Sequence, residues 1–299
     1  MNYNYSIIIP HKNSPDLLER CMDSIPGRKD LQVIIVDDDS SPEKVDFGNF
    51  PGLKRADTTC IFDKSGKGAG HARNIGLSCA TGKWIVFSDA DDFFSSNFNR
   101  ILDEHLNSIA DLTYFDIESV YSETLTPCKR SENYKDKLYK AILDSNMDLL
   151  RYKMTVPWGK IISRMLVCNN NITFDEIPVS NDAWFSLLVG YHAKKVEVSK
   201  EVLYINTENF NSLMHQNSSD KLWCRLKCAA KINKFLVEHK KEQYHVNLFA
   251  YEYYFWHTGI INILKSFVYS FKNTPVFFVC QDLWNCFVSL VIPSRRKLG

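Results

Sequence analysis

Two aspartates that lie two residues apart, Asp89 and Asp91, follow the apolar run at residues 84–87 after a single serine. Side chains two positions apart in an extended segment point to the same side, so both carboxylates can face one cation. Such oxygen ligands suit Mg²⁺ or Mn²⁺, which would offset charge on a departing phosphate group. The same residues could instead form a solvated turn, since a helix dipole favours acidic side chains without any function. Asp92, next in the chain, is expected to cap the helix that follows.

Polar clusters also follow two earlier apolar runs. They are Pro10, His11, Lys12 and Asn13 after residues 5–9, and Asp37, Asp38 and Asp39 after residues 31–36. In a parallel sheet the carboxyl ends of the strands share one edge, and ligands bind beyond it. A carboxylate at position 37 or 38 could accept hydrogen bonds from a nucleobase or ribose, although a capped turn would also use one. The sequence therefore predicts that three polar clusters converge on one rim.

A glycine-rich loop at residues 66–74 leads into a predicted helix. Its glycines, Gly70 among them, would let the backbone approach a phosphate, and Lys67 or Arg73 could neutralise the phosphate charge. Arg73 could equally hold Asp89 or Asp91 in place. The loop is neither a Walker A loop nor a dinucleotide-binding fingerprint, so by itself it does not assign a ligand.

Short β-rich runs alternate with helical patterns over the first 120 residues. Strands are predicted at 5–9, 31–36, 59–62 and 84–87, and helices at 15–25, 72–79 and from 95 or 96 to 109. Ser95 or Ser96 is expected to cap the last helix, and Ile109 to lie on its apolar face. Continuous apolar strands between amphipathic helices predict an α/β fold with a mostly parallel sheet covered on both faces.

Composition limits the possible functions. A chain of 299 residues, 45% of them hydrophobic, can form one large domain or a catalytic domain with a smaller appendage. Its net charge of +1 provides no general attraction to nucleic acid. The 9 cysteines are scattered without a CxxC pair, which favours a reducing cytoplasm. The N-terminus lacks the pattern of a signal peptide, and no apolar run is long enough to predict a membrane span.

Five segments resemble those of the family-2 glycosyltransferases of the GT-A fold in their order and spacing. They are residues 6–10, 35–40, 70–76, 80–82 and 87–92, all within the first hundred residues. Residues 157–160 and 181–185 are similar, more loosely, to the acceptor-side segments of that family. The resemblance implies a Rossmann-like GT-A fold and the inverting transfer of a sugar from a nucleoside diphosphate, usually UDP, to a hydroxyl group.

The resemblance also implies roles for individual residues. The donor site would contain Pro10, His11, Asn13, Asp37, Asp38, Lys67, Gly70, Arg73, Asp89 and Ala90. Asp89 and Asp91 would bind Mn²⁺ or Mg²⁺, with His215 as a further ligand. Asp182 stands at the position of the family's catalytic base, which deprotonates the acceptor hydroxyl. On the acceptor side, Asn181 stands where the family often has a glutamate, and Trp158 either stacks on a sugar or belongs to the core.

The implied acceptor is a glycan or a polyprenyl-linked saccharide used in cell-surface polysaccharide synthesis at the cytoplasmic face of the inner membrane. A catalytically silent, nucleotide-sugar-binding scaffold is an alternative, but Asp89, Asp91 and Asp182 argue against it. A sugar nucleotidyltransferase is a second alternative. It normally needs a glycine-rich loop directly after the first strand, and residues 9–13 lack one.

The chain is expected to contain a catalytic domain at 1–215, with a donor half at 1–110 and an acceptor half at 111–215, and a helical region at 216–299. In the helical region, aromatic stripes at 249–256 and 267–291 precede basic residues at 295–297. This pattern fits a segment that lies on an anionic inner membrane. It fits equally a helical appendage packed on the catalytic domain.

Overall fold

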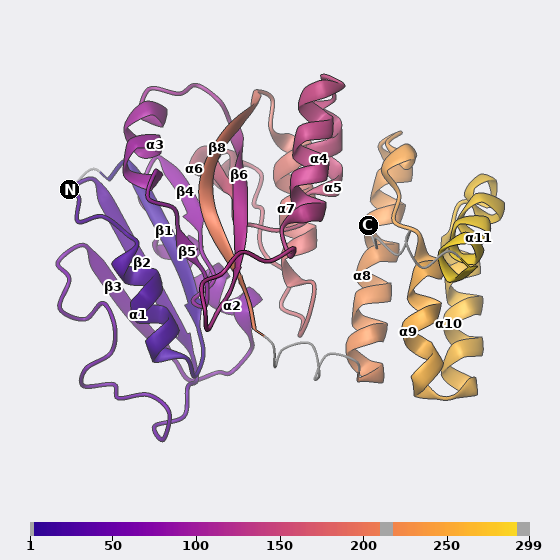
Figure 1. The fold of residues 1–299 in the computed structure, drawn as a ribbon, viewed down its shortest axis with the longest axis horizontal. Helices are drawn as coiled ribbons and strands as arrows, with labels where there is room; N and C mark the ends of the chain where they lie inside the picture. The colour runs from indigo at the N-terminus through magenta and orange to yellow at the C-terminus, as the bar shows by residue number, and fades with distance from the viewer. Residues whose placement is uncertain (1–2, 210–217, 292–299) are drawn as a thin grey trace. The chain divides into compact units, whose positions relative to one another are not determined.

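The computed structural model describes residues 3–209 and 218–291 of the chain (Figure 1). The backbone divides into two compact units. The first consists of Met1–Ile177 and Asn181–Phe210, and the second of Pro178–Ser180 and Asn211–Gly299. In the described residues, strands and helices alternate in the first unit, whereas the second contains helices.

A mixed sheet of eight strands forms the centre of the first unit in its described part. The strand order is β3-β2-β1-β4-β7-β6-β8-β5. The strands are β1 (Tyr5–His11), β2 (Leu31–Asp38), β3 (Thr58–Asp63), β4 (Trp84–Phe87), β5 (Phe93–Phe94), β6 (Leu112–Tyr121), β7 (Lys160–Ser163) and β8 (Val196–Glu208). β3, β2, β1 and β4 run parallel, whereas β7 and β5 pair in the antiparallel direction. The expected α/β fold is confirmed, with its parallel half at the N-terminal end.

Helices cover both faces of the parallel half. The helices of this unit are α1 (Pro15–Asp23), α2 (Ala69–Cys79), α3 (Phe98–His105), α4 (Glu132–Leu143), α5 (Met147–Lys153), α6 (Arg164–Asn169) and α7 (Asn181–His192). α1 connects β1 to β2 and α2 connects β3 to β4, in opposite directions along the sheet. Because crossovers between parallel strands are right-handed, these two helices lie on opposite faces.

The central strands are apolar because both of their faces are covered. Every residue of β1 and β4 is buried, which is typical of parallel strands between two helical layers. α2 packs on β1 and β2. Its approach to β1 is close at Gly76, where a Cβ atom would lie 2.4 Å from Ile8 Cγ2.

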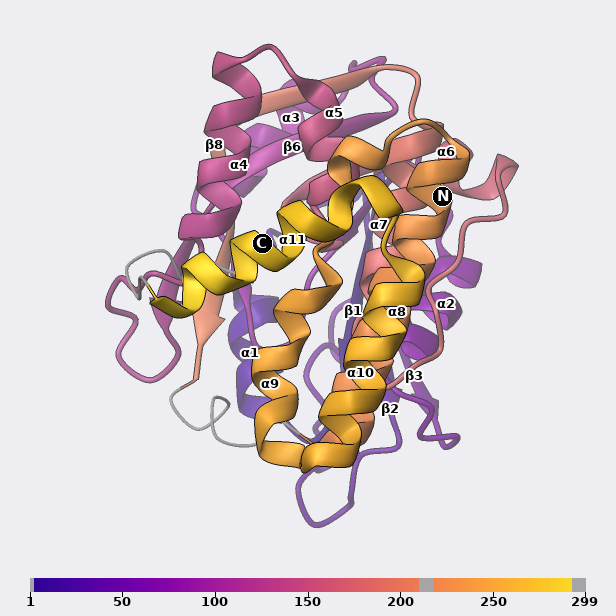
Figure 2. The same ribbon diagram turned by 90° about the vertical axis from the view of Figure 1, so that its right-hand side faces the viewer.

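The second unit is helical in its described part. It contains α8 (Ser219–Glu238), η2 (Glu242–Tyr244), η3 (Leu248–Tyr251), α9 (Glu252–Phe255), η4 (Trp256–Thr258), α10 (Ile260–Asn273) and α11 (Val276–Val291). α8 lies beside α10 (Figure 2). Its core includes Leu222, Leu226, Leu248 and Phe255. Across residues 3–209 and 218–291, every helix is too short or too polar to cross a bilayer.

Two local predictions near α3 are wrong. This helix ends at His105, so Ile109 is 77% exposed instead of lying on an apolar face. The N-cap residue is Asn97 rather than Ser95 or Ser96. The Ser95 hydroxyl donates a hydrogen bond to the backbone of β8 at Val202 instead. The same hydroxyl accepts from the Asn97 backbone N–H at 3.2 Å, so Ser95 joins the turn before the helix to β8.

We expect Gly76→Ala to lower the free energy of unfolding by about 1–3 kcal/mol, because the new methyl group overlaps the branched side chain of Ile8. Gly27→Ala is the matched control, since a Cβ atom there would meet nothing within 4 Å. It should change the free energy by less than about 0.5 kcal/mol. Urea denaturation followed by tryptophan fluorescence measures both, and equal effects would contradict the close packing of α2 on β1.

Candidate active site

The carboxyl ends of β1, β2 and β4 lie side by side at one edge of the sheet. β1 pairs in parallel with both neighbours, with His11 opposite Asp37 and Ile8 opposite Phe87. The polar clusters that end or follow these strands are therefore brought to the same edge. This confirms the predicted convergence on one rim.

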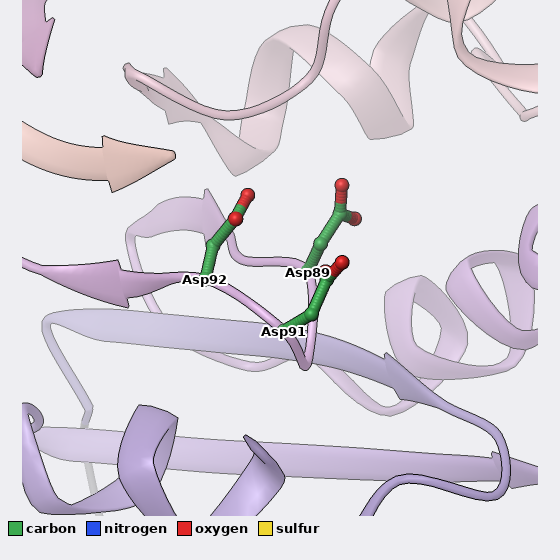
Figure 3. Close-up of side chains that lie close together, drawn as sticks. All are labelled: Asp89, Asp91 and Asp92. Atoms are coloured by element: carbon green, nitrogen blue, oxygen red, sulfur yellow. The ribbon is translucent and has the colours of Figure 1, made fainter. Parts of the chain in front are cut away.

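The turn between β4 and β5 carries three aspartates whose carboxylates point to the same side (Figure 3). One oxygen atom from each of Asp89, Asp91 and Asp92 lies within 4.8 Å of the others. Asp89 is partly buried, Asp91 is exposed and Asp92 is buried. The three carboxylates therefore differ in how far a ligand can reach them.

Asp92 is bound to strand β8. Its carboxylate accepts hydrogen bonds from the Tyr204 hydroxyl at 2.8 Å, the Asn206 amide at 2.8 Å and the Thr207 backbone N–H at 2.6 Å. Burial raises the pKa of Asp92 to about 8, and the charges of the two neighbouring aspartates add to the rise. The expectation that Asp92 caps the next helix is wrong, because this side chain anchors the acidic turn to β8.

Asp91 is the most accessible carboxylate of the turn. Within the described residues its side chain accepts no hydrogen bond from another side chain, whereas its backbone carbonyl accepts from Arg20 at 2.6 Å and from the Thr207 hydroxyl at 2.8 Å. The surrounding protein removes part of the water around the Asp91 carboxyl and so raises its pKa, and the charge of Asp89 raises the pKa further. The backbone is thus fixed beneath a carboxylate that is available to a ligand.

Arg73, on α2, connects the acidic turn to the start of α7. Its guanidinium donates to Asp89 Oδ1 at 2.5 Å and to Asn181 Oδ1 at 2.8 Å. The side chain is only 7% exposed, so water screens its charge little. Of the two roles that the sequence left open for Arg73, the contacts show the one in which it holds Asp89 in place.

Asp182 stands beside Asn181 in the first turn of α7. Burial raises the pKa of its carboxyl, the charge of Arg73 opposes this rise and the charge of Asp89 adds to it. The carboxylate of Asp182 is therefore within electrostatic reach of the acidic turn. Arg73 offsets the repulsion between the two.

Lys160, at the start of β7, is a further charge near Asp182. The residue is 1% exposed, and its ammonium donates to the Met154 carbonyl at 2.9 Å. Burial lowers the pKa of Lys160 to about 7, while the charge of Asp182 acts in the opposite direction. By the same interaction Lys160 lowers the pKa of Asp182. The sequence placed this lysine in the predicted acceptor-side segment at 157–160 and gave it no role of its own.

Comparison with known families identifies the chain. The model of the family described as glycosyl transferase family 2 matches residues 6–167, more than half of the sequence. The chain belongs to this family. It is therefore a glycosyltransferase, as the spacing of its motifs indicated.

Two curated relatives have similar sequences. An uncharacterized glycosyltransferase of Bacillus subtilis (strain 168), EpsJ, is 26% identical over 258 residues, which cover 83% of this chain and 70% of EpsJ. A poly(ribitol-phosphate) beta-glucosyltransferase of Bacillus spizizenii is 26% identical over 240 residues. That match covers 70% of this chain but only 35% of the relative.

Solved structures confirm the GT-A fold. The structure of S. aureus TarS 1–349 in complex with UDP-GlcNAc has a TM-score of 0.67 at 18% identity, over 92% of this chain and 82% of that chain. The mannosyltransferase PcManGT from Pyrobaculum calidifontis, in complex with GDP-Man and Mn²⁺, has a TM-score of 0.55 at 14% identity. This second match covers 99% of this chain and 83% of that chain.

In this family-2 glycosyltransferase, His11 and Asp37 form a buried pair at the rim. His11 Nδ1 lies 2.8 Å from Asp37 Oδ2, and His11 Nε2 accepts from the Ser14 backbone N–H at 3.1 Å. The ring must therefore donate from Nδ1 to the carboxylate. Asp37 also accepts from the Ser40 backbone N–H at 3.0 Å. These contacts fix the relative position of the two strand ends.

Asp38 and Asn13 connect the same rim to its loops. Asp38 accepts from the Lys12 ammonium at 3.1 Å and from the Gly68 backbone N–H at 2.9 Å. The Asn13 side chain accepts from the Ser41 backbone N–H at 2.8 Å. The glycine-rich loop is thereby attached to the end of β2.

The other predicted donor residues differ in their surroundings. Lys67 is exposed, whereas Pro10 and Ala90 are buried. A Cβ atom at Gly70 would lie 2.2 Å from the Asp175 carbonyl oxygen, so α2 can approach that loop only with glycine at this position. The predicted ligand His215 lies outside the described residues.

Trp158 stacks between two tyrosines. Its ring centroid lies 5.4 Å from that of Tyr204 and 5.7 Å from that of Tyr134. The Tyr204 hydroxyl in turn donates to Asp92 and accepts from the Asp89 backbone N–H at 2.9 Å. Trp158 is partly buried, so one part of this aromatic stack supports the acidic turn while another part reaches the surface.

The β8 residues that hold Asp92 were missed in the sequence. Tyr204, Asn206 and Thr207 lie more than a hundred positions from Asp92 and form no motif with it. A buried asparagine within a strand needs a hydrogen-bond partner. Asn206 was therefore a sign in the sequence that a polar side chain packs against β8. It did not show that this side chain is Asp92.

We expect Arg73→Met to lower the free energy of unfolding by about 2–3 kcal/mol, because it leaves Asp89 without its buried cation. Arg100→Met is the matched control, since Arg100 pairs with Glu104 and Glu201 at the surface, where water screens the charges. It should change stability little. Urea denaturation of both variants tests the difference, and a negligible effect at Arg73 would contradict its role in holding the site together.

Proposed function

We propose that this enzyme transfers a sugar, with inversion, from a UDP-sugar to a hydroxyl group of a glycan or polyprenyl-linked acceptor in the presence of Mn²⁺ or Mg²⁺. The observation that supports this most directly is the pair of hydrogen bonds from Arg73 to Asp89 and Asn181. These bonds hold the acidic turn and the first turn of α7, with Asp182, in one site. Such a transfer needs one carboxylate group on the donor side and a separate carboxylate as base.

The acidic turn fits a divalent cation. Its ligand atoms are carboxylate oxygens, which suit both Mg²⁺ and Mn²⁺. β8 occupies the Asp92 carboxylate and Arg73 occupies one oxygen of Asp89, which leaves Asp91 and the second Asp89 oxygen for the ion. When bound, the ion would stabilise the charge of the departing nucleoside diphosphate.

Asp182 would act as the base of the reaction. Its carboxylate takes the proton of the acceptor hydroxyl while the acceptor oxygen attacks the anomeric carbon from the face opposite the diphosphate. The bond from that carbon to the diphosphate oxygen breaks, and the nucleoside diphosphate leaves with the electron pair. A raised pKa makes Asp182 a stronger base than an ordinary aspartate. Asn181 cannot take a proton and accepts from Arg73 instead.

The remaining assignments follow the two halves of the predicted catalytic domain. Residues 1–110 would bind the donor, with the rim from Pro10 to Asn13 and Asp37 or Asp38 near the nucleoside and Lys67 near the phosphates. Residues 111–215 would bind the acceptor, with Trp158 beside it. Neighbours solved with UDP-GlcNAc and with GDP-Man and Mn²⁺ support a nucleotide-sugar donor.

The acceptor is proposed from the relatives. One of them is named as a poly(ribitol-phosphate) beta-glucosyltransferase, which supports a cell-surface polymer or its lipid-linked precursor as acceptor. Synthesis of such a precursor would place the enzyme in the cytoplasm at the inner membrane. A silent scaffold would bind the donor in the same site without transferring the sugar, and variants of Asp182 separate these two functions.

We expect Asp91→Asn to weaken Mn²⁺ binding at least about tenfold, because it removes the most accessible carboxylate of the turn. Asp39→Asn is the control, since Asp39 is an exposed aspartate after β2 at which asparagine tolerates the positive φ of 55°. Its Mn²⁺ affinity should equal that of the wild type. Calorimetric titration with Mn²⁺, with and without a UDP-sugar, measures both. Donor binding that is independent of the metal and of Asp91 would contradict the assignment.

We expect Asp182→Asn to retain donor binding but to reduce transfer by about 10²–10⁴-fold, the usual contribution of a general base.

The wild-type rate should fall as the pH drops through the raised pKa of Asp182, because protonation removes the base. Lys160→Met should move this fall to higher pH, since the lysine charge lowers that pKa. Lys195→Met, an exposed lysine paired with Glu197, is the control.

The pH dependence of transfer by the four proteins separates the roles. If Asp182→Asn loses the transfer activity of the wild type and its donor affinity is unchanged, the result supports Asp182 as the base. Full transfer by Asp182→Asn would exclude it. Equal profiles for Lys160→Met and Lys195→Met would exclude the influence of the buried lysine.

A further inference from the structure

Helix α10 exposes its apolar side chains. Six of its residues are between 42% and 66% exposed and recur at the spacing of one helical face: Ile260, Ile261, Leu264, Phe267, Val268 and Phe271. Scattered apolar residues are normal at a protein surface, but a continuous stripe along a whole helix marks a site of contact.

The opposite face of α10 contains two buried serines. Ser266 and Ser270 are both 0% exposed. The Ser266 hydroxyl donates to Glu252 at 2.6 Å, and the Ser270 hydroxyl lies 3.3 Å from the same carboxyl group. An amphipathic helix of a globular protein normally turns its apolar face inward. In α10 these two serines point inward beside Ile263 and Tyr269, which pack against the core of the unit. The apolar stripe on the other side stays largely exposed, although the Phe267 ring lies 5.5 Å from that of Phe249.

Helix α11 also exposes large apolar side chains. Val276, Phe277, Trp284 and Phe287 are 57–87% exposed. Its acidic residue, Asp282, is 2% exposed and pairs with His245 at 3.0 Å. Both helices belong to the second unit and follow one another directly in the chain (Figure 2).

The charges beside these faces have one sign. Between residues 260 and 288 the sequence contains two lysines, Lys265 and Lys272, and one acid, Asp282. Both lysines are exposed, whereas the acid is buried in its pair with His245. The surface is therefore apolar with cations at its borders, which matches a bilayer with anionic headgroups.

We propose that α10 and α11 form a docking surface for an anionic lipid bilayer, on which they lie parallel to the membrane plane. The exposed aromatic and aliphatic side chains enter the boundary between headgroups and acyl chains, and the two lysines contact lipid phosphates. In their described parts the two helices have 14 and 16 residues, fewer than the roughly 20 that cross a bilayer.

A second copy of the chain fits this surface less well than lipid does. A two-fold interface brings the same surface patch of both subunits together. Here it would bring Lys265 and Lys272 of each copy close to those of the other, and neither helix has an exposed acid in its described part to pair with them. Anionic lipid supplies the missing opposite charge.

Vesicle flotation with the full-length chain tests the proposal. The probes are vesicles of phosphatidylcholine alone and of phosphatidylcholine with phosphatidylglycerol. We expect binding to the anionic vesicles that weakens with added salt, and at least a tenfold loss of affinity in the triple variant Ile261→Ser, Leu264→Ser, Phe271→Ser. These three side chains are exposed, so their replacement leaves the core intact.

Two controls separate this surface from general stickiness. Ile109→Ser, Leu143→Ser and Met165→Ser together remove three apolar side chains of the first unit that are 64–83% exposed, and this variant should float like the wild type. Lys265→Glu with Lys272→Glu should reduce binding to the anionic vesicles only. Equal flotation of the two triple variants would overturn the proposal. The proposal would also be overturned if the wild type does not bind vesicles but forms a dimer in light scattering, and the α10 variant does not form that dimer.

Discussion

Repulsion between carboxylates is the constraint on which this site depends. Asp89, Asp91 and Asp92 present oxygens within 4.8 Å of one another, and Asp182 adds a further carboxylate near them. The protein offsets this repulsion with a buried cation, Arg73, at Asp89 and with the raised pKa of Asp92, which favours its neutral form. Both effects require the closely packed first unit. The charge that remains is at Asp91, the position that a ligand can reach.

The asparagine at position 181 fits this balance of charge. Its amide oxygen accepts a hydrogen bond from Arg73, as a carboxylate would, but it adds no charge beside Asp182. A glutamate there would compete with Asp89 for the single arginine and raise the pKa of Asp182 further. The departure from the usual acidic pair therefore changes how the arginine is shared, while the candidate base is still present.

The rim of the site was predictable because it follows from the ends of consecutive parallel strands, whose apolar runs are visible in the sequence. The anchor of Asp92 was not, because it depends on the pairing of β5 with β8, two strands that lie far apart in the sequence. Arg73 illustrates an intermediate case. Its residue type limited it to a phosphate or a carboxylate, and only the distances showed that it contacts Asp89. Ile109 was misplaced because α3 ends at His105, before the apolar pattern of the sequence does.

The C-terminal helices show what an amphipathic pattern leaves undetermined. The pattern identifies an apolar face but does not say whether protein or another phase covers it. The inward side of α10 carries Ser266 and Ser270, which contact the carboxyl group of Glu252 on α9, and burial raises the pKa of that carboxyl. The hydrogen bonds among these polar groups offset the cost of burying them, whereas leaving Leu264 and Phe271 in water is unfavourable. The arrangement would become favourable if a lipid bilayer covered the apolar face. The helix is therefore better explained by a surface that the chain contacts than by its own packing alone.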